Sequence, residues 1–146
     1  MARRTRWVVA AEMSALVVAG LALVGCQKHA VAHKAEHPAE VQPIRGSSLK
    51  KVILTEGAAK RLDVGTAKVW EEGGETLVPY SSLIYDPKGK VWVYTSSAPR
   101  TFVRQEVEVV RIQGDRVVVK VGPPPGTMVA SRAVAELYGT ELAVGH

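Results

Sequence analysis

The stretch that decides the fold is residues 91–121, VWVYTSSAPRTFVRQEVEVVRIQGDRVVVKV. Residues 91–95 alternate aliphatic or hydroxyl side chains with aromatic ones, and residues 101–112 alternate valines with charged or polar residues. Alternation with a period of two is typical of a strand that buries one face. Gly114-Asp115 then turns the chain into the valine-rich residues 116–121, so the sequence predicts an antiparallel β-hairpin here.

Short strands also precede this stretch. Residues 76–78 and 83–85 are β-prone and flank Pro79, while Asp86-Pro87-Lys88-Gly89 has a favoured residue type at each position of a turn. After the hairpin, residues 122–126 (GPPPG) cannot join a central strand and are predicted to form a loop.

Two short helices complete the expected domain. Thr55 can cap a helix over residues 56–62, in which Ala58 and Leu62 supply an apolar side. Residues 133–138 have room for one or two helical turns before Gly139. The sequence therefore predicts a small, mainly antiparallel β-domain with two short helices, spanning residues 50–146.

Composition narrows the classes of function. The chain has 146 residues, which favours one domain, and its single cysteine cannot form an internal disulfide. Part of the net charge of +5 lies in residues 1–25, and the remaining Lys and Arg residues are scattered. Nucleic-acid binding is typically marked by clustered basic residues, so we expect no nucleic-acid partner.

The first 25 residues are typical of an export signal. Arg3-Arg4-Thr5-Arg6 is a basic start, and residues 13–24 form an apolar run too short for a membrane-spanning helix. The run ends in Leu23-Val24-Gly25-Cys26, which resembles the lipobox of bacterial lipoproteins. The resemblance implies cleavage before Cys26, lipidation of its thiol, and an extracytoplasmic, membrane-anchored location (the periplasmic side in a Gram-negative cell). The alternative is an uncleaved anchor with a buried, inert Cys26.

Residues 26–49 lack aromatic side chains and have few large apolar ones, so they are predicted to form a disordered tether. His29, His33 and His37 recur every fourth residue, a spacing at which histidines on a helix can chelate zinc or copper. Pro38 biases His37 away from the helix. A polar tether without specific metal binding is the preferred interpretation, and metal capture by at least His29 and His33 is the alternative.

Several segments together resemble the periplasmic adaptor subunits, or membrane fusion proteins, of tripartite efflux pumps, especially the heavy-metal branch. In chain order they are VILTEGAAKRLDVGTAKV (52–69), VPYSSLIYDPKGKVWVY (78–94), TFVRQEVEV (101–109), GDRVVVKVGPPPGTMV (114–129) and AELYGTEL (135–142). Full adaptors insert a helical hairpin, a lipoyl-like domain and a further β-domain between such pieces. Here only a few polar residues join Val69 to Val78, so the chain resembles a reduced adaptor that keeps the membrane-proximal β-domain.

The resemblance implies a non-catalytic accessory protein that needs no cofactor and docks on an efflux transporter or a full-length adaptor. Exposed parts of Trp92, Tyr94 and Phe102 are candidate partner contacts, although ordinary cross-strand packing is the preferred role for these aromatics.

Two other classes of function are possible. The first is a periplasmic metal buffer that uses the histidines of the tether. The second is an enzyme with a hydrolase triad drawn from Ser81, Ser82, Asp86 and His146, and it is disfavoured because no glycine pattern of a nucleophile elbow surrounds the two serines.

Overall fold

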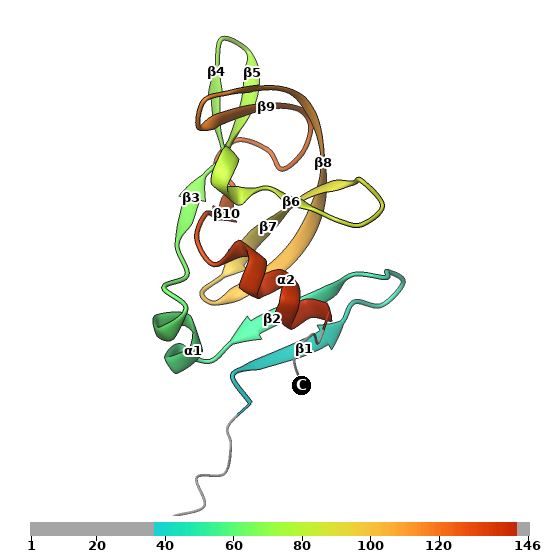
Figure 1. Ribbon diagram of the computed structural model, residues 1–146, viewed down its shortest axis with the longest axis vertical. Helices are drawn as coiled ribbons and strands as arrows, with labels where there is room; N and C mark the ends of the chain where they lie inside the picture. Colours follow the sequence, from blue (N-terminus) through green and yellow to red (C-terminus); the bar gives the residue numbers. More distant parts are fainter. Residues whose placement is uncertain (1–36, 143–146) are drawn as a thin grey trace, which may run out of the picture. The chain divides into compact units, whose positions relative to one another are not determined.

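The computed structural model describes residues 37–142, which form one antiparallel sheet with two α-helices (Figure 1). The strands and helices are β1 (Ala39–Pro43), β2 (Lys50–Leu54), α1 (Glu56–Arg61), β3 (Thr66–Lys68), β4 (Trp70–Glu72), β5 (Glu75–Pro79), the 3₁₀ turn η1 (Tyr80–Ser82), β6 (Ile84–Tyr85), β7 (Val91–Ala98), β8 (Thr101–Gln113), β9 (Arg116–Val121), β10 (Met128–Ala130) and α2 (Val134–Leu142). This confirms the predicted mainly antiparallel β-domain with two short helices.

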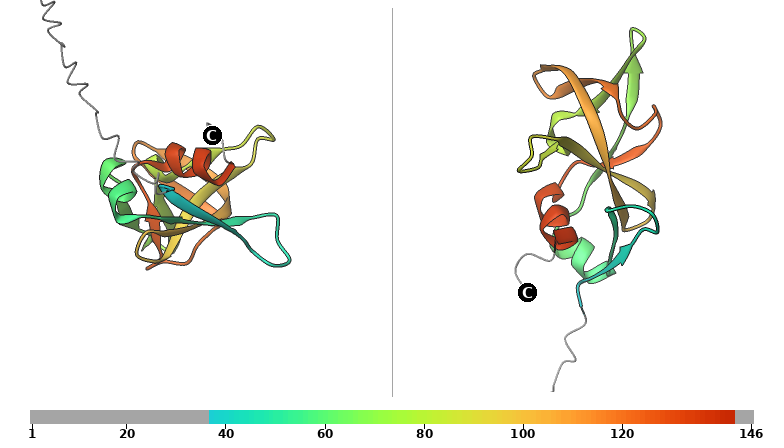
Figure 2. Two further views of the ribbon diagram at one scale, coloured as in Figure 1. Left: turned by 90° about the horizontal axis from the view of Figure 1, so that it is seen from below. Right: turned by 90° about the vertical axis from the view of Figure 1, so that its right-hand side faces the viewer.

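The main sheet curls until it nearly closes on itself. Its strand order is β3-β10-β7-β8-β9-β5-β4, so the two ends of the order are consecutive segments of the chain. Val69 joins them, and it donates a 2.8 Å hydrogen bond to Thr127 and accepts a 2.7 Å bond from Gly126. In this segment β3 pairs with β10 and β4 pairs with β5, so it connects the two ends of the sheet. Figure 2 shows the curled sheet from below.

Strand β8 links the two halves of the sheet. Its first half pairs with β7 on one side and β2 on the other, and its second half pairs with β9. The register shifts around Val109 and Arg111, as expected where a long strand bends. The predicted hairpin is confirmed, because Gln113 lies opposite Arg116 and Gly114 takes a positive φ of 63° in the turn.

The predicted local structure is also present around the first helix. The Thr55 hydroxyl accepts a 3.2 Å hydrogen bond from the Ala58 amide, which is the expected N-cap of α1. Helix α2, in contrast, continues through Gly139 to Leu142, beyond the predicted end.

Two apolar cores lie on opposite faces of β7. Val93 belongs to a cluster of valines enclosed by the curled sheet, whereas Tyr94 belongs to a cluster beneath α1 and α2. Successive strand residues point to opposite faces, so one strand supplies both cores. The members of the first cluster are Val69, Val78, Val93, Val107, Val117, Val119 and Val129, and those of the second are Val52, Leu54, Ala58, Tyr94, Phe102, Ala130, Val134 and Leu137.

The folded part begins earlier than predicted. The sequence predicts a disordered tether over residues 26–49, but Ala39–Pro43 forms β1 and pairs in register with Lys50–Leu54. A strand of modest apolar content is stable here because β2 satisfies its backbone and its side chains at Ala39 and Val41 are half-buried. The domain boundary therefore lies before β1, not at residue 50. Cys26, His29 and His33 lie outside the described residues.

Within the described range, neither helix has the length and apolar character needed to cross a membrane.

Candidate functional site

A buried carboxylate marks the site. Glu141 lies on α2 at the position that continues the inward stripe of Val134, Leu137 and Tyr138, with the i, i+3, i+4, i+7 spacing of one helical face. It is only 1% exposed. Carboxylates are almost never this buried unless they are paired, so the surrounding residues must compensate for the lost hydration.

Tyr94 supplies part of that compensation. Its hydroxyl donates a 2.6 Å hydrogen bond to Oε2 of Glu141. Burial, and then the hydrogen bond and negative charge of Glu141, raise the pKa of the Tyr94 hydroxyl well above its ordinary value. Tyr94 is therefore a neutral donor fixed between the sheet and α2.

Arg104 supplies the opposite charge. It lies directly across from Tyr94 in the β7–β8 register, so both side chains emerge on the same face of the sheet. Its Nε is 3.2 Å from Oε2 of Glu141, yet this N–H makes no hydrogen bond of acceptable alignment in the described chain. The contact is therefore better described as a close charge pair than as a directed hydrogen bond.

Two aromatic rings hold the Arg104 guanidinium. Its central carbon is 4.4 Å from the ring centroid of Trp92 and 5.4 Å from that of Tyr138. Both distances are within the range of cation–π attraction. Trp92 belongs to β7 and Tyr138 to α2, so the guanidinium contacts one ring from the sheet and one from the helix.

The β-turn that precedes β7 fixes the side chain of Trp92 through Asp86. The indole Nε1 donates a 3.1 Å bond to Oδ2 of Asp86, and Oδ1 accepts 2.9 Å bonds from the amides of Lys88 and Lys90. Burial alone would raise the pKa of Asp86, but these hydrogen bonds together lower it below its ordinary value. The predicted turn over residues 86–89 is thus confirmed and is part of the site.

Arg104, Trp92, Tyr138 and the Asp86 turn line an open groove of about 400 Å³, which we call the Arg104 groove; Tyr94 and Glu141 are buried and do not line it. Lys88, Lys90 and Arg104 bring positive charge to the lining. Lys90 is paired with Glu106 and Arg104 with Glu141, whereas Lys88 forms no ion pair with a described side chain. The Asp86 carboxylate accepts hydrogen bonds from its own turn and from Trp92. The lining residues are Ser48, Leu49, Asp86, Pro87, Lys88, Lys90, Trp92, Arg104, Tyr138 and Leu142.

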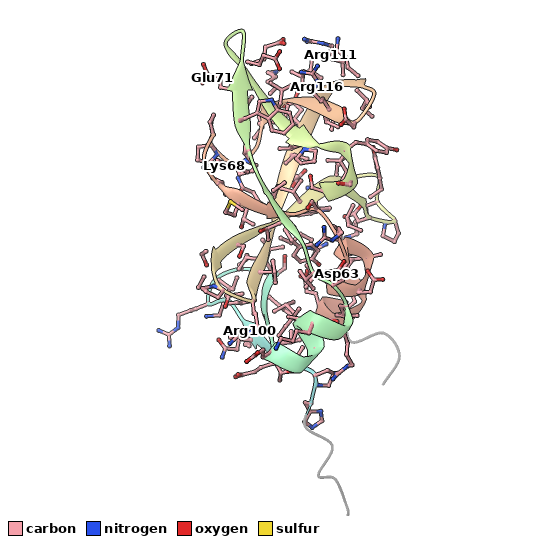
Figure 3. The ribbon with its side chains drawn as sticks, turned by 90° about the vertical axis from the view of Figure 1, so that its left-hand side faces the viewer. Asp63, Lys68, Glu71, Arg100, Arg111 and Arg116 are labelled. Carbon is pink, nitrogen blue, oxygen red and sulfur yellow. The ribbon has the colours of Figure 1, made fainter. Side chains whose placement is uncertain are left out.

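A larger hollow of about 640 Å³ follows the bend of β8, between Val91 and Val121. Its charged side chains already have partners, because Lys90 pairs with Glu106 at 2.8 Å and Glu108 with Lys120 at 3.5 Å. The exposed ion pairs at the β4–β5 end, where Figure 3 shows Arg111 and Arg116, are likewise satisfied by Glu75 and Glu72. The Arg104 groove is the better candidate, because its lining includes Lys88, a cation that forms no ion pair with any described side chain.

The residues proposed as partner contacts divide between core and surface. Tyr94 and Phe102 are 0% and 2% exposed, so they cannot contact a partner in this fold. They pack in the core beneath the helices, the role preferred for them from the sequence. Trp92 is half-buried and forms a wall of the Arg104 groove.

Among the described residues, the other candidates, His37, Ser82 and Asp86, do not come together. His37 is exposed just before β1 and is not in a helix, and no cluster of three metal-ligating side chains occurs among residues 37–142. The Ser82 hydroxyl donates to the Pro79 carbonyl at 2.6 Å, and the Asp86 carboxylate is held by its own turn. The two residues are therefore engaged elsewhere rather than with each other.

Sequence reasoning missed Arg104, Tyr138 and Glu141. The available signal was the spacing on α2, because a stripe through Val134, Leu137 and Tyr138 places Glu141 on the buried face. A buried acid predicted in this way requires a cation, although its identity could not be read from local sequence.

Comparisons of the chain with families of known proteins, with curated proteins and with solved structures found no match.

Proposed function

We propose that this chain is a non-catalytic, lipid-anchored extracytoplasmic accessory protein, resembling an efflux-pump adaptor, that docks on a membrane transporter or a full-length adaptor. The lipid is attached at Cys26. The docking surface is centred on the Arg104 groove rather than on the buried aromatics Tyr94 and Phe102.

One observation carries this proposal. Three of the adaptor-like segments, far apart in the sequence, meet at the Arg104 groove. Residues 78–94 contribute the turn and Trp92, residues 101–109 contribute Arg104, and residues 135–142 contribute Tyr138 and Glu141. If these positions only stabilised the fold, apolar residues would be sufficient at them. Their convergence on a charged groove supports a role in recognition.

The rigidity of the groove also supports docking. Trp92 is held by Asp86, Arg104 is held by two rings and Glu141, and Glu141 is held by Tyr94. Side chains fixed before binding lose little conformational entropy when a partner arrives. Arg and Trp are also the residue types that most often dominate binding energy at interfaces.

The test is a crosslinking pull-down of the intact protein from native membranes, read by mass spectrometry. We expect a transporter or a full-length adaptor to be recovered with the wild-type chain. Cys26→Ser is the matched control, because it leaves the domain unchanged and removes the lipid, and it should reduce the recovery. A folded, lipidated protein that recovers no such partner would contradict the proposal.

A further inference from the structure

The Arg104 guanidinium has unused hydrogen-bonding capacity. Neither of its terminal nitrogens donates a hydrogen bond to another residue of 37–142, and its Nε, 3.2 Å from Oε2 of Glu141, makes no aligned hydrogen bond there. The side chain is 11% exposed and is one of those that line the Arg104 groove. A guanidinium presents its donors in a planar fork that matches two oxygens of one ligand.

The positive charges of the groove outnumber its carboxylates, because Lys88, Lys90 and Arg104 line it together with Asp86 alone. Glu141 is buried and is not among the residues that line the groove, whereas the Asp86 carboxylate lines it and is bound by its own turn and the indole. Lys88 is exposed at the rim and forms no ion pair with any described side chain. The open side of the groove therefore combines one recessed fork with one free ammonium group.

The apolar side chains that line the Arg104 groove determine which ligands fit into it. Trp92, Tyr138 and Leu142 line the groove with apolar surface around the recessed Arg104. A partly apolar groove with cations in its lining suits a side chain with a methylene stem and a charged end. It is less suited to a highly hydrated dianion such as phosphate, which would remain in contact with apolar walls.

From these contacts we infer that the Arg104 groove binds an acidic side chain, Glu or Asp, projecting from the partner protein, with Arg104 taking its carboxylate in a two-point hydrogen bond and Lys88 closing over it. The inference rests on the proposed docking function and names the chemistry of the partner at that site. Paired hydrogen bonds between Arg and a carboxylate are among the stronger and more directional polar contacts.

Zero-length carbodiimide crosslinking tests this in native membranes, because it joins an amine to a carboxylate only when the two touch. We expect mass spectrometry to recover Lys88 linked to an Asp or Glu of the captured transporter or adaptor. A partner that is captured only through lysines remote from the groove, such as Lys51 or Lys120, would overturn this inference while leaving the docking function intact. Failure to capture any partner would instead overturn the docking function.

A titration decides the groove chemistry independently of any partner. The purified full chain, labelled with ¹⁵N in detergent micelles, is titrated with the capped peptide acetyl-Gly-Glu-Gly-amide, with its Gln counterpart and with inorganic phosphate. We expect only the Glu peptide to shift the Arg104 Nε–H and Trp92 indole resonances, with a dissociation constant on the order of 1 mM for a single contact of this kind.

Matched variants distinguish binding in the Arg104 groove from an effect of the net charge of the protein. Lys88→Gln should weaken the Glu peptide about threefold, while Arg61→Gln removes the same charge from exposed α1 and should change nothing. Arg104→Lys keeps the charge but loses the fork, so we expect about tenfold weaker binding. Equal shifts from the Glu and Gln peptides, stronger shifts from phosphate, or full binding by Lys88→Gln would each overturn the inference.

Discussion

Replacing Glu141 by Gln isolates the charge of the buried acid. The amide keeps an oxygen that can accept the hydrogen bond of the Tyr94 hydroxyl, so that bond survives. What is lost is the negative charge 3.2 Å from Arg104. Arg104 is then left as a nearly buried cation whose remaining compensation comes from the rings of Trp92 and Tyr138.

The size of the effect follows from burial. Removing one member of a buried ion pair typically costs about 3–5 kcal/mol. Arg104 keeps an open edge on the groove, where water can approach it, so we expect the loss to lie near the lower limit, about 3 kcal/mol. Glu141→Ala also leaves the Tyr94 hydroxyl without an acceptor, which adds about 1 kcal/mol or more. Tyr94→Phe removes only the hydrogen bond to a charged group and should cost about 2 kcal/mol.

Urea unfolding at pH 7, followed by circular dichroism, measures these differences in the free energy of unfolding. Glu71→Gln is the matched control, since it removes the same charge from the exposed strand position labelled in Figure 3 and should stay within about 0.5 kcal/mol of wild type. The expected order of destabilisation is Glu141→Ala, Glu141→Gln, Tyr94→Phe, then the control. A Glu141→Gln protein as stable as the control would refute the description of Glu141 as the buried counterion of Arg104.

Four further predictions concern other parts of the chain. The pKa of Asp86 is lowered in the fold, so its contribution to stability is complete above about pH 4, near the ordinary pKa, and is lost as the pH falls through the folded value. Asp86→Asn should flatten this part of the curve of unfolding free energy against pH, measured by urea unfolding. A slope equal to that of the wild type would argue against the lowered pKa of Asp86. Thr55→Ala should lower the free energy of unfolding by about 1 kcal/mol, because the cap on α1 is lost, whereas Thr55→Ser should not. Cys26→Ser should abolish incorporation of a radiolabelled fatty acid and release the protein from membranes in a fractionation experiment; continued labelling would exclude Cys26 as the attachment site. If the tether captures metal, isothermal titration with zinc should show binding that disappears when His29 and His33 are both changed to Ala, and heat that is identical in the two proteins would favour the plain polar tether.

The fold was predictable where its cause is local. The hairpin turn at Gly114, the turn at Asp86 and the cap at Thr55 each depend on residues within a few positions of one another, so their chemistry is visible in the sequence. Strand β1 was not predictable in this way. Residues Ala39–Pro43 have little apolar content, and they are ordered by pairing with β2, a partner that local composition does not reveal.

The candidate site depends even more on distant contacts. Tyr94 and Glu141 are 47 positions apart, and the groove needs β7, β8 and α2 to be in place together. Trp92 was identified because it is a large aromatic in a strand. Arg104 was not, because an arginine in an alternating strand is normally assigned to the solvated face, and only the register with Tyr94 places it beneath α2.

The connection between β3 and β4 at Val69, which links the two ends of the sheet, has a consequence for the order in which the chain folds. Strands β7, β8 and β9 pair through short connections, so they can associate early at small entropic cost. The pairing of Thr66–Lys68 with Met128–Ala130 brings together segments separated by most of the domain. We therefore expect this pairing to form late, and α2, which directly follows β10, to settle against the sheet with it. Until that last step, Arg104 has neither Glu141 nor Tyr138 beside it, so the Arg104 groove is complete only when folding is essentially finished.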